Sequence, residues 1–168
     1  MSLSATLTEL VLACAPLVAP ETALRLIQAE SANHPFAINV NGPYVLRPQP
    51  QSPAQAVATA RALLQMPDVA SIDVGLAQIN SANFRWLGLS LETAFDPCTN
   101  LQAMQTVLLD GYARAAARHG PGLKALQEAL SRYNTGRPQA GFRNGYVARV
   151  WRQPLPSDTP LTPSRPSP

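Results

Sequence analysis

Residues 30–37 read Glu30-Ser31-Ala32-Asn33-His34-Pro35-Phe36-Ala37, and the periodicity of the sequence changes across them. Before this stretch, apolar residues recur at helical spacing after Pro20, which predicts a helix that begins near Pro20 and ends near residue 30. After it, apolar and polar residues alternate around Asn41-Gly42, which predicts a small hairpin within residues 37–46. The stretch therefore joins a helix to a small β element.

Glu30 falls at the C-terminal end of that predicted helix, an unfavourable place for a carboxylate with a purely structural role. The carbonyl groups at a helix C-terminus carry partial negative charge. This charge disfavours the ionised form of the carboxyl group and so raises its pKa. Glu30 is therefore a candidate general acid, although a glutamate at a helix end is more often simply solvated.

Two further polar clusters interrupt apolar patterns: Gly75-Leu76-Ala77-Gln78-Ile79-Asn80 and Tyr133-Asn134-Thr135-Gly136. Each lies where a predicted helix begins or ends, and such places bring backbone and side-chain polar groups together in clefts. Taken singly, each cluster also fits an ordinary structural role, as a helix cap or as a simple turn. Their combination with Glu30 is what suggests one functional cleft.

The rest of the sequence has mostly helical patterns. Apolar residues recur at intervals of three and four over residues 3–15, 54–66, 81–87, 100–119, 123–133 and 142–151. The length of 168 residues suits one domain, and we predict a mostly α domain over residues 1–153 with one small hairpin. Residues 154–168 are rich in Pro, Ser and Thr, which predicts a disordered tail.

The composition argues against several classes of function. The net charge of +3 comes without Lys/Arg blocks interleaved with aromatic residues, so we expect no nucleic-acid partner. His34 and His119 lack the spacing of metal ligands, so we expect no metal. No apolar stretch approaches the ~20 residues that cross a bilayer, and residues 10–19 make a poor export signal.

The two cysteines, Cys14 and Cys98, belong to no CxxC pair or Cys/His cluster. They fit either two buried thiols or, in an oxidising compartment, a disulfide that closes a long loop. Composition alone leaves both alternatives open.

In their order along the chain, the three clusters resemble the motifs of the lysozyme-like lytic transglycosylases, the soluble-transglycosylase family. That family carries Glu-Ser-x-x-[Asn/Asp]-Pro-x-Ala, then Gly-Leu-x-Gln-[Ile/Val], then Tyr-Asn-x-Gly. The resemblance covers roughly residues 16–151. It implies a lysozyme-like (goose-type) α-helical domain with a small β-hairpin inserted after the catalytic glutamate. It also implies peptidoglycan glycan strands as the substrate, with no cofactor.

The segment between the first two clusters resembles, more narrowly, the specialised transglycosylases of type IV secretion and conjugation machines. In those relatives a Cys before Ala-Pro and a Cys after Asp-Pro recur together, as Cys14 and Cys98 do here. The resemblance therefore implies a Cys14–Cys98 disulfide, a periplasmic location, and type IV secretion components as partners. One departure is Ala77, where many relatives have Met; we expect the smaller side chain to alter a sugar subsite without removing a group needed for bond cleavage.

The resemblance also implies a mechanism and a set of site residues. Glu30 would protonate the departing O4 of the bond between N-acetylmuramic acid and N-acetylglucosamine. It would then take the proton of the muramic acid 6-hydroxyl, which closes on C1 to give a 1,6-anhydro product. Apolar burial should keep Glu30 protonated at neutral pH. We expect substrate-binding groups at Ser31, Gln78, Asn80, Tyr133 and Asn134, with Asn80 also suited to ordering its loop.

Two other interpretations stay open at this point. A hydrolytic muramidase would use water and would need a second carboxylate, for which Asp73 is the nearest candidate. A non-catalytic module would keep the fold and bind the cell wall without turnover. The presence of Glu30 together with Gln78 and Tyr133 argues against the non-catalytic module.

Overall fold

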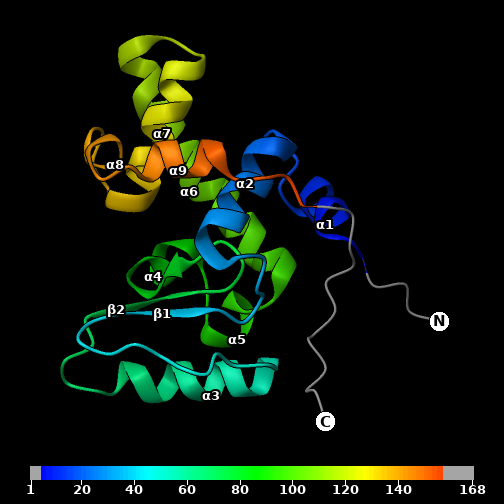
Figure 1. The fold of residues 1–168 in the computed structure, drawn as a ribbon, viewed down its shortest axis with the longest axis vertical. Coiled ribbons are helices and arrows are strands. Elements are labelled where there is room, and N and C mark those ends of the chain that lie inside the picture. Colours follow the sequence, from blue (N-terminus) through cyan, green and yellow to red (C-terminus); the bar gives the residue numbers. More distant parts are fainter. Residues whose placement is uncertain (1–4, 157–168) are drawn as a thin grey trace.

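A small antiparallel sheet and one long helix organise the chain in the computed structural model, which describes residues 5–156 (Figure 1). The longer helices are α1 (Leu7–Cys14), α2 (Pro20–Ser31), α3 (Pro53–Leu64), α6 (Pro97–His119), α7 (Leu123–Thr135) and α9 (Tyr146–Arg152). The short ones are a 3₁₀ turn, η1 (Ser81–Asn83), with α4 (Phe84–Leu87), α5 (Leu91–Ala94) and α8 (Ala140–Arg143). The mostly α fold is confirmed. Most of the predicted tail, residues 157–168, lies outside the described residues.

Local capping chemistry explains where the helices begin. Thr6 and Glu9 form a reciprocal capping box, so α1 begins at Leu7 and not at the predicted residue 3. Asp96 accepts a hydrogen bond from the backbone N–H of Thr99, and α6 therefore begins three residues before its predicted start. Helix α2 begins at Pro20, as predicted, and its C-terminal end carries Glu30.

The sheet contains β1 (Ile38–Asn41), β2 (Ser71–Val74) and β3 (Ile79–Asn80), in the order β1-β2-β3. Strand β1 pairs antiparallel with β2, and β2 pairs with β3 across the turn of residues 75–78. The prediction of a hairpin about Asn41-Gly42 is therefore wrong. The partner of β1 comes about thirty residues later in the chain, with Asn41 opposite Ser71.

Two features of the chain explain this correction. Pro43, Pro48 and Pro50 follow β1 in the sequence, and proline has no N–H to donate to a strand ladder. Gly42 allows the backbone of the Asp68 segment to pass close to the end of β1, because a Cβ at residue 42 would lie 2.6 Å from the carbonyl oxygen of Asp68. The Asn-Gly pair thus marks the end of β1 beside a distant segment.

The predicted helix over residues 142–151 is also wrong in one respect, because the structure divides it into α8 and α9. Gly145 has φ +81° between them, a left-handed conformation that interrupts the helix. The Asn144 side-chain oxygen accepts a hydrogen bond from the backbone N–H of Tyr146 at 2.9 Å. The break allows α9 to start at Tyr146 and to follow its own direction.

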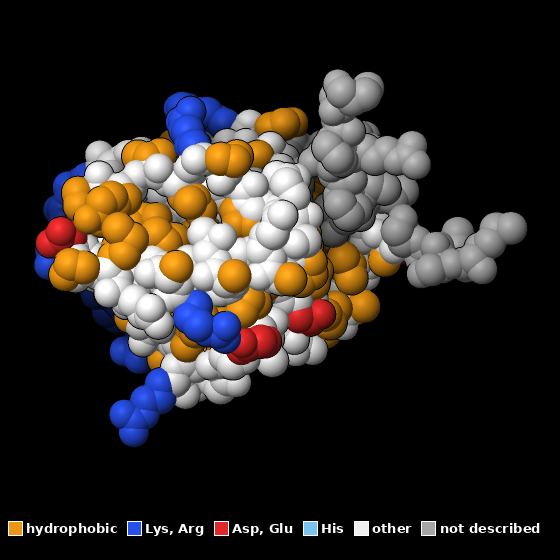
Figure 2. Space-filling model, turned by 90° about the horizontal axis from the view of Figure 1, so that it is seen from below, with side chains coloured by type: hydrophobic (Ala, Val, Ile, Leu, Met, Phe, Trp, Pro, Cys, Tyr) orange, Lys and Arg blue, Asp and Glu red, His pale blue; other side chains and the backbone are white. Residues whose placement is uncertain are grey.

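Two hydrophobic clusters form the interior. The larger joins α1, α2, α6, α7 and α9 with β3 and the turn before it, and the smaller joins β1 and β2 with α3 and α5. Figure 1 shows the smaller cluster's helix α3 below the sheet and helices α7 to α9 at the opposite end. Phe84 and Leu89 pack against both clusters. Viewed from the side of α3, apolar side chains are interspersed with polar ones, and charged groups lie mainly toward the margin (Figure 2).

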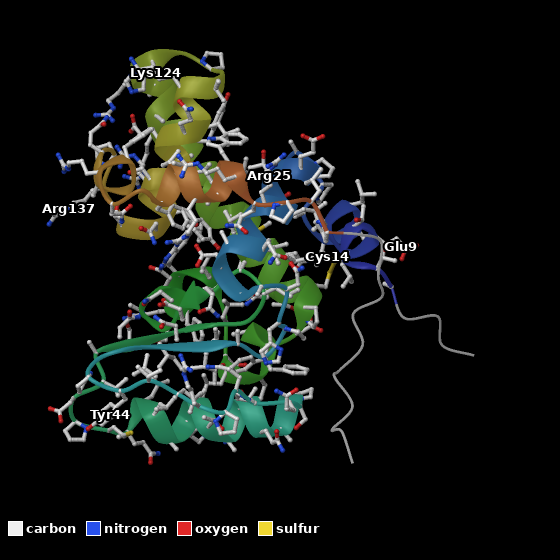
Figure 3. The ribbon with its side chains drawn as sticks, viewed as in Figure 1. Glu9, Cys14, Arg25, Tyr44, Lys124 and Arg137 are labelled. Atoms are coloured by element: carbon white, nitrogen blue, oxygen red, sulfur yellow. A yellow bond between two sulfur atoms is a disulfide. The ribbon has the colours of Figure 1, made fainter. Side chains whose placement is uncertain are left out.

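A disulfide fastens the N-terminal helix to the long central one. Cys14 at the end of α1 is bonded to Cys98 in the first turn of α6, with 5.3 Å between the Cα atoms (Figure 3). The implied pairing is therefore confirmed. At the other end of the chain, Arg25 of α2 donates hydrogen bonds to the carbonyl oxygens of Trp151 and Gln153. In the described part of the chain, no helix has both the length and the hydrophobicity that a bilayer crossing requires.

Candidate active site

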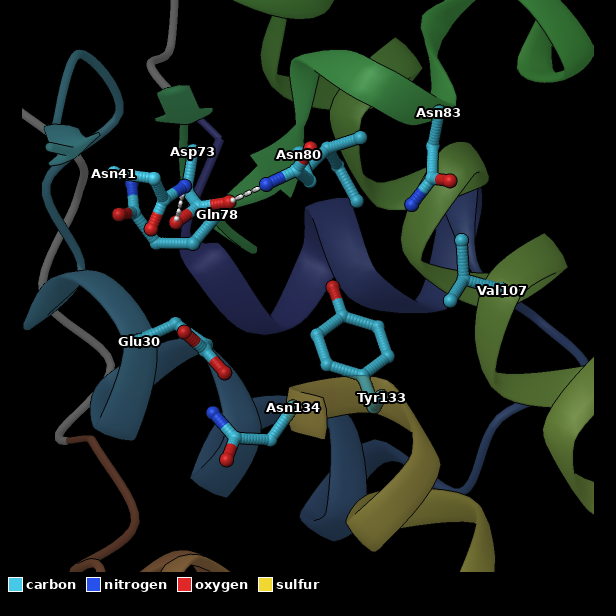
Figure 4. Close-up of a pocket in the computed structure, with 10 residues that line it drawn as sticks. Glu30, Asn41, Asp73, Gln78, Asn80, Asn83, Val107, Tyr133 and Asn134 are labelled. Carbon is cyan, nitrogen blue, oxygen red and sulfur yellow. Dashed lines mark hydrogen bonds between the residues drawn. The ribbon is translucent and has the colours of Figure 1, made fainter. Parts of the chain in front are cut away.

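A polar cleft of about 190 Å³ lies between the sheet and the helical part of the molecule (Figure 4). The helical wall brings Glu30 from α2 and a pair of residues from α7. The opposite wall comes from the sheet and the turn between β2 and β3. The full lining is Glu30, Asn41, Asp73, Gln78, Ile79, Asn80, Asn83, Val107, Tyr133 and Asn134.

Glu30 has the electrostatic properties of a general acid. Burial disfavours its charged form and raises the pKa of the carboxyl group to about 7. A hydrogen bond from Tyr146 lowers the pKa, the negative charge of Asp73 raises it, and Arg149 lowers it by a smaller effect. A large fraction of Glu30 is therefore protonated at neutral pH, and the same group is able to give up and take back a proton.

Tyr146 holds Glu30 in place. Its hydroxyl donates a hydrogen bond to Oε1 of Glu30, across 116 residues of sequence. The Tyr146 side chain is buried, and the guanidinium of Arg149 lies 5.2 Å from its ring centroid. Tyr146 is not among the predicted site residues, because it falls within the apolar pattern of residues 142–151. A tyrosine on an otherwise apolar helical face is the only, weak, signal of it.

The turn of residues 75–78 places Gln78 in the cleft. Gln78 has φ +51°, and its side-chain Nε2 donates to the carbonyl oxygens of Ala37 and Gly75 at 3.1 and 3.0 Å. These two bonds use both amide hydrogens, so the Oε1 atom is left to accept a hydrogen bond from a ligand. A non-glycine residue with positive φ is strained, and such strained residues cluster at active sites and ligand-binding sites.

Side chains from three helices bond to the same turn. Ser31 Oγ donates to the carbonyl oxygen of Leu76 at 2.7 Å, and the Tyr133 hydroxyl donates to the carbonyl oxygen of Ala77 at 2.7 Å. Asn100, which is fully buried in α6, accepts from the backbone N–H of Ala77 at 2.8 Å. The turn is therefore fixed by α2, α6 and α7 together.

Asp73 faces the cleft from β2, and its carboxylate accepts hydrogen bonds from three side-chain amides. Asn80 donates at 2.7 Å to one oxygen, while Asn41 and Asn39 donate at 3.0 and 3.2 Å to the other. A carboxylate offers about four acceptor positions, so most of those of Asp73 are occupied. This leaves Glu30 as the carboxyl group in the cleft that is free to exchange a proton with a ligand.

The structure brings most of the predicted site residues together. Five of them line the cleft: Glu30, Gln78, Asn80, Tyr133 and Asn134. Ser31 does not line it and instead ties α2 to the turn. Asn134 accepts a hydrogen bond from Asn144 at 2.9 Å through Oδ1, and its Nδ2 points toward the cleft beside Glu30 (Figure 4). Among the described residues, no three His, Cys, Asp or Glu side chains gather as metal ligands would.

Comparisons with known proteins agree with this arrangement. Residues 11–150 match the family described as "Transglycosylase SLT domain". "Protein virB1" of Agrobacterium fabrum is 41% identical over 138 residues, which cover 82% of this chain and 54% of the relative. "Type IV secretion system protein virB1" of Brucella abortus (strain 2308) is 40% identical over 144 residues, covering 82% of this chain and 59% of the relative. No solved structure shows a significant match.

The chain thus spans little more than half the length of these curated relatives. The family match, however, runs from residue 11 to residue 150 and so takes in every residue that lines the cleft, as well as Tyr146. The chain belongs to the transglycosylase SLT domain family.

Proposed function

We propose that this chain is a peptidoglycan lytic transglycosylase, which cleaves the β-1,4 bond between N-acetylmuramic acid and N-acetylglucosamine and forms 1,6-anhydromuramyl products. The observation that carries the proposal is Glu30, whose carboxyl group lies in a polar cleft of about 190 Å³ and has its pKa raised to about 7. Such a group is suited to act first as an acid and then as a base in one turnover.

The chemistry requires no further reactant. Glu30 gives its proton to O4 as the C1–O4 bond breaks, and the N-acetylglucosamine side leaves with a free 4-hydroxyl. The 6-hydroxyl oxygen of the same muramic acid then bonds to C1, and its proton returns to Glu30. The hydrogen bond from Tyr146 stabilises the carboxylate between the two steps and fixes its direction.

Two amide groups of the cleft are suited to the acetamido substituents of the sugars. The free Oε1 of Gln78 accepts from an acetamido N–H, and Nδ2 of Asn134 donates to an acetamido carbonyl oxygen. Asn80 instead orders the sheet wall through its bond to Asp73. Tyr133 packs beside Glu30 and keeps the turn in place through Ala77.

A hydrolytic muramidase is the second candidate, and Asp73 is the observation that favours it. Its carboxylate lies in the same cleft as Glu30, as a second catalytic carboxylate would. The three amides that bond to Asp73 argue instead for an electrostatic role, in which its charge helps to keep Glu30 protonated. The two activities differ in their products, since hydrolysis gives reducing ends.

We further propose that the enzyme opens the cell wall locally for a type IV secretion or conjugation apparatus in the periplasm. Two observations support this context. One of the relatives is named as a type IV secretion system protein. A disulfide such as Cys14–Cys98 is typical of oxidising compartments, among them the bacterial periplasm.

The test is digestion of purified peptidoglycan by the wild type, by Glu30→Gln and by Asp73→Asn, with products identified by mass spectrometry. We expect anhydromuropeptides from the wild type and a rate that is lower by about 10²–10⁴-fold in Glu30→Gln, because the proton donor is lost. Asp73→Asn is the matched control, since it too replaces a cleft carboxylate by an amide; we expect it to lower the rate less and to keep the anhydro product.

Three outcomes would contradict the proposal. Reducing-end products from the wild type, lost in Asp73→Asn, would make the protein a muramidase. Equal activity of Glu30→Gln and the wild type would remove Glu30 from the chemistry. A folded wild type that binds peptidoglycan but releases nothing would be a non-catalytic wall-binding module.

A further inference from the structure

A second pocket, of about 170 Å³, adjoins the cleft between α6 and α7. Its lining is Val107, Asp110, Gly111 and Arg114 from α6, with Arg132 and Gly136 from α7 and its C-cap. Val107 lines both spaces, and Figure 4 shows it at the end of the cleft away from Glu30. A ligand in the cleft therefore reaches this second pocket by passing Val107.

The two arginines of the pocket differ in how their charges are balanced. Arg114 is paired inside the pocket with Asp110, at 2.9 Å between Nε and Oδ2, and both side chains are exposed. Arg132 is paired through Nε with Glu128 at 2.9 Å, and Glu128 does not line the pocket. In the described part of the chain, no residue accepts a hydrogen bond from the two terminal amino groups of Arg132. The pocket lining thus has one net positive charge and uncommitted donors.

The buried partner keeps Arg132 in position. Glu128 is 1% exposed and also contacts Arg118 and His119. Burial opposes ionisation of Glu128, but hydrogen bonds from Arg132, His119 and Arg118 outweigh it and lower the pKa of Glu128 to about 2. Glu128 is therefore ionised at neutral pH and anchors the Nε side of Arg132. An arginine that is fixed from behind in this way is preorganised for a ligand in front of it.

The chemistry of the free guanidinium edge selects an anionic ligand. Two parallel amino groups match the two oxygens of a carboxylate. The sugar rings of peptidoglycan offer no charged group, but each muramic acid carries a peptide on its lactyl group, and that peptide bears carboxylates. Three extended residues span about 10 Å. The cleft and the pocket share Val107 in their linings, so a peptide on a sugar in the cleft extends toward the pocket past this side chain.

We propose that the pocket around Arg132 binds a carboxylate of the stem peptide, so that the enzyme prefers glycan strands that still carry their peptides. This inference rests on the proposed function. It assigns to Arg132 a role in substrate selection that is separate from the proton transfer by Glu30.

The test compares kcat/KM on glycan strands that carry stem peptides with kcat/KM on strands stripped of peptide by an amidase. We expect the wild type to prefer the peptide-bearing strands by about tenfold, the effect of one charge-assisted hydrogen-bonded pair. Arg132→Gln should bring the ratio close to 1. Arg118→Gln is the matched control, because Arg118 bonds to the same Glu128 but does not line the pocket; it should keep the wild-type ratio.

A wild-type ratio of 1, an unchanged ratio in Arg132→Gln, or an equal loss in Arg118→Gln would overturn the inference and leave the charged network with a structural role alone. If the wild type cleaves neither kind of strand, the proposed function fails separately. The pocket is then judged by NMR titration with N-acetylmuramyl-L-Ala-D-Glu. Shifts of the Arg132 side-chain signals in the wild type, with binding lost in Arg132→Gln, would support the inference, and no shifts would refute it.

Discussion

The hydrogen bond from Tyr146 to Glu30 acts in opposition to burial. Burial raises the pKa of Glu30, and the phenolic hydroxyl lowers it by stabilising the carboxylate. The proposed reaction begins with protonated Glu30, so activity should fall as the pH rises through the pKa of about 7. The position of this alkaline limb therefore reports on the environment of Glu30.

Tyr146→Phe removes the hydroxyl and leaves the ring. We expect the alkaline limb of the pH–rate profile to move to higher pH, because the carboxylate loses a donor and the pKa of Glu30 rises. The kcat at the optimum should fall by roughly tenfold, because the carboxyl group is less well oriented. Tyr133→Phe is the control variant, because the Tyr133 hydroxyl donates to the carbonyl oxygen of Ala77 and not to Glu30. The alkaline limb of its pH–rate profile should move less than that of Tyr146→Phe. A limb that stays in place in Tyr146→Phe would contradict the assignment.

Sequence reasoning at this scale identified Glu30 and placed Gln78, Asn80, Tyr133 and Asn134 near it, because short motifs carry these residues. It did not identify Tyr146, since no local pattern reports a contact between positions 116 residues apart. The Glu128–Arg132 pair was missed for a related reason. A charged residue on a helix is usually solvated, and only the packing of α7 against α6 buries Glu128.

The β2–β3 turn is the element on which the cleft depends most directly. Gly75 opens it with φ +78°, and the amide of Asn100 fills the space where a Cβ would be, with Nδ2 at 2.3 Å from that position. Asn100 also donates hydrogen bonds to the carbonyl oxygens of Val74 and Ala94. The turn and α6 are thus interlocked at a position where only glycine fits.

Gly75→Ala should lower the free energy of unfolding by more than about 2 kcal/mol, because a left-handed alanine and a displaced buried amide both cost stability. Gly88→Ala separates the two effects. Gly88 has a similar φ of +67° but nothing within 4 Å of an added Cβ, so its substitution should cost only about 1 kcal/mol. Urea denaturation of both variants measures the difference. If both variants lose the same free energy of unfolding, the close contact between residue 75 and Asn100 does not contribute to stability.

Helices were easier to predict than strands in this chain. Capping residues and prolines act locally, so the starts of α2, α3 and α7 lie close to the expected positions. The pairing of β1 with β2 is non-local, because the whole of α3 lies between these two strands in the sequence. The Asn-Gly signal at the end of β1 predicted a local hairpin, and nothing within residues 37–46 indicates the distant partner.

The disulfide acts on the molecule as a whole, because it closes a loop of 84 residues between α1 and α6. On the chain-entropy account, a loop of this length contributes about 4.5 kcal/mol, and disulfides are typically worth about 2–4 kcal/mol. Neither cysteine lines the cleft. Stability and activity should therefore respond differently to its loss.

We expect the double variant Cys14→Ala/Cys98→Ala to unfold at lower urea concentration, with a free energy of unfolding lower by about 2–4 kcal/mol, while the folded protein still cleaves peptidoglycan. Adding a reductant should lower the free energy of unfolding of the wild type to a value similar to that of the double variant. The reductant should leave the free energy of unfolding of the double variant unchanged. If reductant and substitution have no effect on unfolding, the bond does not form in solution.

Both hydrophobic clusters support the cleft, the larger through its helices and the β2–β3 turn, and the smaller through strands β1 and β2. Glu30 and Asn134 stand on helices of the larger cluster, while Asp73 and Asn41 stand on strands of the smaller one. Substitutions in the smaller cluster therefore act first on the strands that carry Asp73 and Asn41, and substitutions in the larger cluster act first on the helices that carry Glu30 and Asn134. On the proposed function, we expect a lineage with this fold to adapt to cell walls of different composition mainly through the β1–β2 side of the groove, while the helices that carry Glu30 and Asn134 change less.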